Sequence, residues 1–108
     1  MIDIVHKLQF EKLLFKSLKP ISPRELGSRK KIYIYLGVDL KRYYSCIIHI
    51  NKKSPILQKE TKELIELHKK LEEYNDSVIK RKYIYIQAPL CSKAKALFEK
   101  EDWIVWID

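Results

Sequence analysis

The chain has 108 residues, of which 46% are hydrophobic and 33% charged, and its 22 lysine and arginine residues exceed its 14 acidic residues to give a net charge of +8. This length and composition exclude two cores of ordinary size, wholesale disorder and low-complexity repeats, so we expect a single domain over residues 1–108. The sequence contains no apolar run of membrane-spanning length, no signal peptide and no disulfide framework, which together predict a cytoplasmic protein without a membrane partner.

The first third of the chain is expected to contain a helix followed by a basic loop. Residues 4–18 carry apolar side chains at helical spacing, and Glu11 falls within the apolar face that they define. Residues 20–31 include proline and glycine and end in three consecutive cations, Arg29, Lys30 and Lys31. We therefore predict a mobile basic loop over residues 20–31.

The remaining elements are expected to form a mixed sheet flanked by helices. Alternating residues predict a hairpin of two strands at 31–38 and 43–50, and Ser54 followed by Pro55 predicts the start of a helix that extends to about residue 74. A strand over 80–87, a helix over 92–100 and a strand over 103–107 then predict a right-handed crossover with parallel strands. The predicted fold class is α/β, a three-layer mixed sheet flanked by helices in the order α-β-β-α-β-α-β.

The positive charge is concentrated in one half of the chain. Residues 1–56 carry 12 basic and 4 acidic side chains, whereas residues 57–108 carry 10 of each. Such an excess attracts polyanions, so DNA or RNA is the expected partner, although the charge could also serve solubility alone. The candidate contacts are the cations in and near the predicted hairpin, provided that they share one surface around its turn: Arg29, Lys30, Lys31, Lys41, Arg42, Lys52 and Lys53.

Several chemistries are excluded by the residue types that are absent. With only two glycines the chain has no phosphate-binding loop and no dinucleotide fingerprint, and its three scattered histidines have no zinc-ligand spacing. Tyrosines on the predicted strands could stack nucleobases beside the hairpin cations, or they could fill the core. The alternatives for single residues stay open too, since Asp39 is a common hairpin-turn residue and His49 could be a packed strand residue.

The hairpin resembles the PD-(D/E)XK nuclease superfamily. Gly37-Val38-Asp39 is similar to the first acidic motif, and residues 46–55 are similar to the strand and turn of the second, with His49 where the family has a metal-binding acid and Asn51 where it has a lysine. The resemblance implies a restriction-endonuclease-like fold and, in an active enzyme, Mg²⁺ bound by Asp39 with catalytic roles for Asp39, Glu11 and Lys52 or Lys53. The predicted elements include one strand fewer than the family's three before the central helix.

Three functions follow from these observations. The first is a nucleic-acid-binding protein on an endonuclease-like scaffold with a degenerate catalytic centre. The second is an Mg²⁺-dependent endonuclease that uses Asp39 and a nearby lysine. The third is an interaction module that forms a homodimer without nucleic acid.

Overall fold

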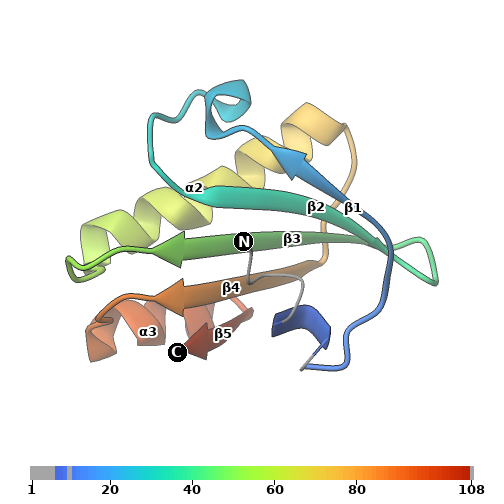
Figure 1. Ribbon diagram of the computed structural model, residues 1–108. Coiled ribbons are helices and arrows are strands. Elements are labelled where there is room, and N and C mark those ends of the chain that lie inside the picture. Colours follow the sequence, from blue (N-terminus) through green and yellow to red (C-terminus); the bar gives the residue numbers. More distant parts are fainter. Residues whose placement is uncertain (1–6, 10, 108) are drawn as a thin grey trace.

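The protein forms one five-stranded mixed sheet with two long connecting helices (Figure 1). The structure is a computed structural model, and it describes residues 7–9 and 11–107. The strands lie across the sheet in chain order: β1 (Phe15–Ile21), β2 (Tyr33–Asp39), β3 (Tyr44–Asn51), β4 (Arg81–Gln87) and β5 (Trp103–Ile107). The connections contain the 3₁₀ helix η1 (Pro23–Leu26) and the α-helices α2 (Gln58–Asn75) and α3 (Ser92–Lys100). No helix in the described part of the chain is long and apolar enough to cross a membrane.

The predicted crossover at the carboxyl-terminal end is confirmed, because β4 and β5 are parallel and α3 connects them. β3 also pairs with β4 in parallel, and α2 connects these two strands. The predicted start of the first crossover helix at Ser54 and Pro55 is wrong. Ile56 instead forms a bridge with Leu90, which holds the chain extended until α2 begins at Gln58.

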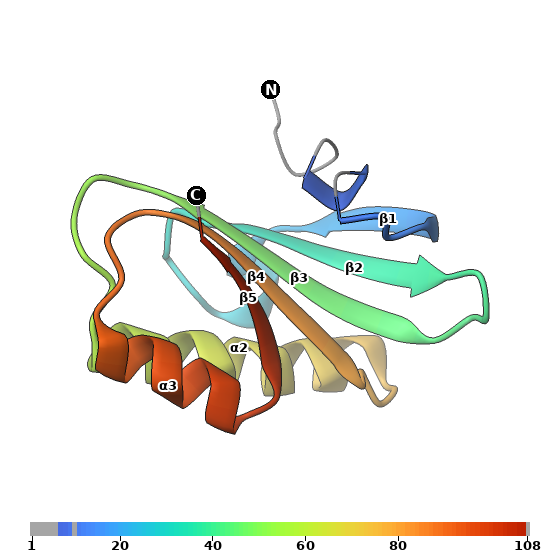
Figure 2. The ribbon, with the colours of Figure 1, turned by 90° about the horizontal axis from the view of Figure 1, so that it is seen from below.

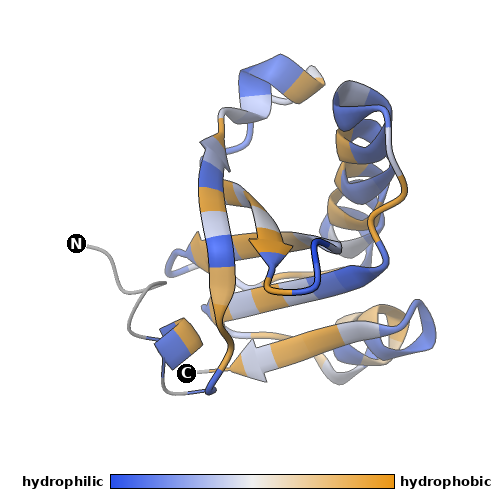
Figure 3. Cartoon of the chain, turned by 90° about the vertical axis from the view of Figure 1, so that its right-hand side faces the viewer, coloured by the Kyte–Doolittle hydropathy of each residue, from blue (hydrophilic) through white to orange (hydrophobic). Residues whose placement is uncertain are grey.

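Both long helices cover the same face of the sheet (Figure 2). On this face aliphatic side chains of β3 and β4, such as Ile48 and Ile84, pack with Leu64 and Leu71 of α2 and are fully buried. Hydrophobic and hydrophilic bands alternate along α2, as expected of a helix with one face on a core (Figure 3). We call the opposite side of the sheet the outer face. It is covered by side chains from the start of the chain, including Leu8, Leu13, Phe15 and Leu18.

The predicted helix over residues 4–18 is wrong in its second half. Residues 7–9 are helical, but the chain turns at residues 11–12 and β1 begins at Phe15; residues 1–6 and 10 lie outside the described residues. The three-layer prediction therefore needs correction, because the described residues provide a short helical turn and no long helix on the outer face. β1 is a third strand before α2, and the sequence analysis did not predict it.

A β-bulge gives β1 apolar residues at helical spacing. The register of β1 against β2 shifts between Phe15 and Ser17, so that Phe15 lies opposite Asp39 and Leu18 opposite Gly37. Both residues therefore face the same side of the sheet although they are three positions apart, which is helical spacing. The basic loop also contains more structure than expected, because Ser22 and Glu25 form a capping box around η1.

Candidate nucleic-acid interface

Asp39 stabilises the turn between β2 and β3. Its Oδ1 atom accepts hydrogen bonds from the backbone N–H groups of Lys41 and Tyr43, each at 2.9 Å. This is the usual role of an aspartate at the start of a turn, and it lets Arg42 adopt a left-handed conformation with a φ of 69°. The carboxylate is thus already engaged by two amide donors.

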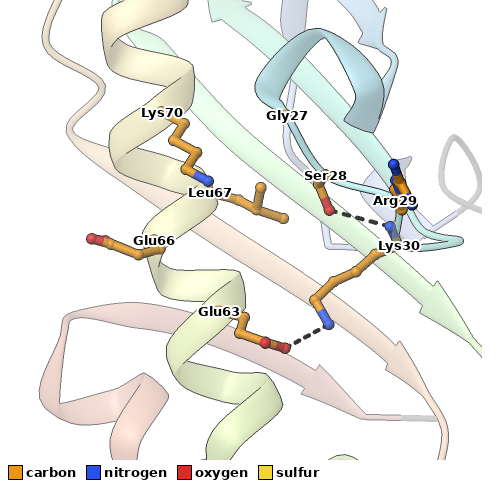
Figure 4. Close-up of a pocket in the computed structure, with 8 residues that line it drawn as sticks. All are labelled: Gly27, Ser28, Arg29, Lys30, Glu63, Glu66, Leu67 and Lys70. Carbon is orange, nitrogen blue, oxygen red and sulfur yellow. Dashed lines mark hydrogen bonds and ion pairs between the residues drawn. The ribbon is translucent and has the colours of Figure 1, made fainter.

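Lys52 and Lys30 form ion pairs with acids on α2. The Lys52 Nζ atom donates a hydrogen bond of 2.6 Å to Glu60, and the Lys30 Nζ atom lies 2.7 Å from Glu63, a contact drawn in Figure 4. The hydrogen bond from Lys30 is the main reason why the pKa of Glu63 lies below its ordinary value. Lys30 precedes β2 and Lys52 follows β3, so their ion pairs connect this end of the hairpin to α2. The glutamates of α2 partly neutralise the charge of both lysines.

The residues proposed for catalysis do not converge. In the β2–β3 hairpin, Tyr33 lies opposite His49 and Val38 lies opposite Tyr44, so Asp39 is at the opposite end of the sheet from His49 and Lys52. Six residues of strand separate these two levels, about 20 Å at the usual rise. The carboxylate of Glu11 pairs with Lys7 at 3.1 Å over the outer face, and no contact within the described residues joins it to Asp39 or Lys52.

The described residues do not provide a donor set for Mg²⁺. Among residues 7–9 and 11–107, no three His, Cys, Asp or Glu side chains gather closely enough to hold a metal ion. Mg²⁺ requires oxygen ligands in near-octahedral geometry, and the carboxylate oxygen of Asp39 that faces the turn already accepts two hydrogen bonds. The side chains that the structure describes therefore do not fit this cation.

The candidate cations fall into two groups at opposite ends of β2 and β3. Arg29, Lys30 and Lys31 precede β2, and Lys52 and Lys53 follow β3, so these five lie at one end. Lys41 and Arg42 lie in the hairpin turn at the other end. The expectation that all seven cations share one surface around the turn is therefore wrong, because an antiparallel hairpin places the turn and its open end a full strand length apart.

We call the open end of this hairpin, with Arg29, Lys31 and Lys53, the basic end. These three side chains are exposed, and none has an ion pair within the described residues. Tyr33 starts β2 at the same end, and 55% of its surface is exposed. The basic end thus combines uncompensated positive charge with an accessible aromatic ring.

The outer face carries a row of stacked rings that ends at Tyr33. His49 lies between Tyr33 and Tyr85, with ring centroids 5.6 Å and 4.9 Å away, and its Nε2 atom is 2.7 Å from Oε1 of Gln87. His49 is buried, and its Nδ1 atom has no hydrogen-bond partner in the described part of the protein. The sequence pointed to His49 and Tyr33 separately, but Gln87 was missed, because its position beside His49 depends on the register of the parallel β3–β4 pair.

Solved structures with a similar fold include EndoMS and a repair endonuclease. A structure of EndoMS in apo form has a TM-score of 0.58 and 19% identity, and the alignment covers 97% of this chain and 44% of that one. A repair endonuclease from Pyrococcus abyssi has a TM-score of 0.55 and 18% identity, with 97% and 44% covered. An EndoMS complex with double-stranded DNA has a TM-score of 0.55 and 16% identity, with 97% and 42% covered.

The fold is similar to that of repair endonucleases. At these identities the likeness concerns the fold alone, and the chain spans less than half the length of the proteins that it resembles. No family model matches the sequence, and a search of curated proteins found no relative.

Proposed function

We propose that this chain binds nucleic acid through the basic end and that its endonuclease-like scaffold is catalytically degenerate. The observation that carries the proposal is the gathering, beside exposed Tyr33, of three exposed cations that form no ion pair with any described residue. Uncompensated lysine and arginine side chains bind phosphates by releasing counterions, and aromatic rings add contacts to the bases. Supporting evidence comes from the fold, since one structural neighbour was solved with double-stranded DNA.

Degeneracy is supported by the placement of the residues that resemble catalytic ones. Asp39 caps a turn at one end of the hairpin, whereas His49 and Lys52 lie at the other end. A metal-dependent nuclease needs carboxylates and a base around one scissile phosphate, and the described side chains lack that arrangement.

Salt-dependent binding is the test of the proposal. We expect fluorescence anisotropy with labelled DNA and RNA strands to show an affinity that falls by orders of magnitude between about 50 and 200 mM salt. The triple variant Arg29→Ala/Lys31→Ala/Lys53→Ala should bind at least about tenfold more weakly, and its plot of log affinity against log salt should be shallower by about 2 to 3.

Matched control variants distinguish the contribution of the basic end to binding from the effect of lowering the net charge of the protein. Lys93, Lys95 and Lys100 are exposed on α3, so replacing all three with alanine removes the same charge elsewhere. This control should retain the wild-type slope, and Lys41→Ala/Arg42→Ala reports whether the hairpin turn contributes. Equal losses in the basic-end and α3 variants would contradict the proposal, as would salt-insensitive binding.

The likeness to repair endonucleases keeps an Mg²⁺-dependent endonuclease as a second candidate. It predicts nicking of duplex DNA only when Mg²⁺ or Mn²⁺ is added, and loss of nicking in Asp39→Asn. Our proposal predicts that no nicking occurs under conditions in which the protein binds DNA.

A third candidate function is the formation of a homodimer, and the edge strand β5 favours it. All five residues of β5 are apolar, and Ile104 and Ile107 are about half exposed, whereas the opposite edge strand β1 carries Lys16, Lys19 and Pro20. Charges and prolines at edges prevent strand addition, and β5 has neither. Light scattering over a range of protein concentrations tests this candidate: a dimer that Ile104→Lys converts to a monomer supports it, and a wild-type monomer at every concentration excludes it.

A further inference from the structure

The stack of rings on the outer face is open at Tyr33. Its other end, Tyr85, is buried and lies beneath the ammonium group of Lys7, which is 5.3 Å from the ring centroid. On the open side, β1 ends with Ile21 opposite Ile34, so no β1 residue pairs with Tyr33. The ring of Tyr33 is therefore supported by His49 on one side and accessible over about half of its surface.

A cavity adjoins this open end. It has a volume of about 510 Å³ and lies where the chain leaves β1 for η1, with Pro20, Ser22, Pro23, Glu25, Tyr33 and Tyr35 among its lining residues. This volume lies within the range of sites that hold small molecules. Burial, followed by the nearby Tyr33, raises the pKa of Tyr35 above its ordinary value, so the hydroxyl of Tyr35 stays neutral beside the cavity at physiological pH. We call it the β1–β2 cavity.

The wall of the cavity opposite β2 is held by hydrogen bonds. The Glu25 carboxylate accepts one from the backbone N–H of Ser22 and another from the hydroxyl of Tyr74 on α2, each at 2.9 Å. Pro23 begins η1 and has a fixed φ angle. The capped turn that lines the cavity is thus tied to α2, which preorganises this part of the lining for a ligand.

Cations lie close in the chain to residues that line the cavity. Arg24 follows Pro23, and with Arg29 it lines a separate hollow of about 630 Å³ that also includes Gly27 and Ser28. Lys31 lies two residues before Tyr33 and is exposed. A ligand with a flat aromatic part and a negatively charged part would therefore find complementary groups, with its ring at Tyr33 and its phosphates at the arginines and Lys31.

We propose that the β1–β2 cavity binds an unpaired nucleobase stacked on Tyr33, so that this chain prefers single-stranded nucleic acid to duplex. The inference rests on the proposed nucleic-acid binding and specifies its substrate. In a duplex both faces of a base are covered by neighbouring bases, whereas a single strand can turn a base outward to continue the stack of Tyr33, His49 and Tyr85.

The test compares a short single strand of thymidine nucleotides with a duplex of equal length, using Tyr33→Leu and Tyr33→Phe. We expect Tyr33→Leu, which keeps an apolar side chain but removes the ring, to weaken single-strand binding about five- to hundredfold. Duplex binding and the salt slope should stay near wild type, and Tyr33→Phe should retain single-strand binding. Tyr43 is exposed to a similar degree at the hairpin turn, so Tyr43→Leu is the matched control and should have no effect.

An abasic strand of the same length gives an independent readout, because it keeps the phosphates and removes the bases. Wild-type affinity should fall on the abasic strand to the level of Tyr33→Leu, and Tyr33→Leu should lose little further. The inference is overturned if Tyr33→Leu binds the thymidine strand like wild type while the basic-end triple variant loses affinity, and in that case the proposed function still stands. A wild-type preference for duplex also overturns the inference, and absence of binding to any strand overturns both. Circular dichroism of Tyr33→Leu confirms that a loss of affinity is not a loss of fold.

Discussion

The two faces of the sheet are packed in different ways. The helix-covered face is aliphatic and closed, since Ile48, Ile84 and Leu64 have no exposed surface. The outer face is built from stacked rings under a short segment of chain, and it leaves Tyr33 and Ile104 about half exposed. The face sealed by two helices has no room for a ligand, so the proposed nucleic-acid contact at Tyr33 belongs to the opposite side of the sheet.

Truncation of an aliphatic side chain gives the largest expected effect. Ile84→Ala should reduce the free energy of unfolding by about 2 to 5 kcal/mol, because it leaves a cavity in a face that two helices close. Ile104→Ala on the outer face should cost less than about 1 kcal/mol, since its side chain is already half in water. Urea denaturation of both variants measures this difference, and equal losses would show that the two faces contribute alike.

The next largest effect on stability is expected at Gly37, where the side chain of Phe15 lies close to the backbone on the outer face. A Cβ atom at Gly37 would lie 2.8 Å from two ring carbons of Phe15 and 3.2 Å from the Cδ1 atom of Ile47. Gly37→Ala should therefore destabilise the protein by about 1 to 3 kcal/mol through overpacking between β1 and β2. Adding Phe15→Leu should recover part of the loss in the same denaturation assay, and an unchanged loss would show that the ring is not the obstacle.

The pH dependence of stability reports on the closed face through Cys46. Burial raises the pKa of the Cys46 thiol from an ordinary value of 9.0 to about 12. Above pH 9 the unfolded chain releases this proton while the folded protein retains it, so stability falls as the pH rises from about 9 towards 12. Between pH 8 and pH 10 we expect a loss of roughly 1.4 kcal/mol from this group. Cys46→Ala should lose less stability over the same interval, and an identical pH profile would refute the assignment.

The hairpin turn between β2 and β3, which lies outside both packed faces, gives the smallest expected effect. Asp39→Ala removes two hydrogen bonds at an exposed position and should cost about 1 kcal/mol. Asp39→Asn keeps an oxygen acceptor and should stay close to wild type in thermal unfolding. If Asn destabilises as much as Ala, the negative charge of Asp39 matters more than its turn geometry.

The elements that the sequence predicts well are those whose signal is local. The crossover helix over 92–100 and the strand over 103–107 appear at the expected residues. Trp103 and Trp106 face opposite sides of the sheet as their spacing requires, and Trp103 is the buried one. Each of these features follows from alternation or helical periodicity within a few residues.

The features that escaped prediction depend on pairing between distant segments. The bulge that makes β1 look helical exists only against β2, and the neighbourhood of His49 and Gln87 exists only through the parallel register of β3 and β4. The separation of Asp39 from Lys52 follows from the length of the hairpin, although the resemblance to the PD-(D/E)XK superfamily implied a common site.

The sequence by itself determined an α/β sheet with parallel crossover strands and an excess of positive charge in its first half, because periodicity and composition are properties of the chain. Only the tertiary structure decided that the two helices share one face, that the cations divide between two ends, and that Tyr33 stands open beside a cavity. These outcomes depend on which strands pair and in which register, and each strand's own residues are compatible with more than one choice of partner.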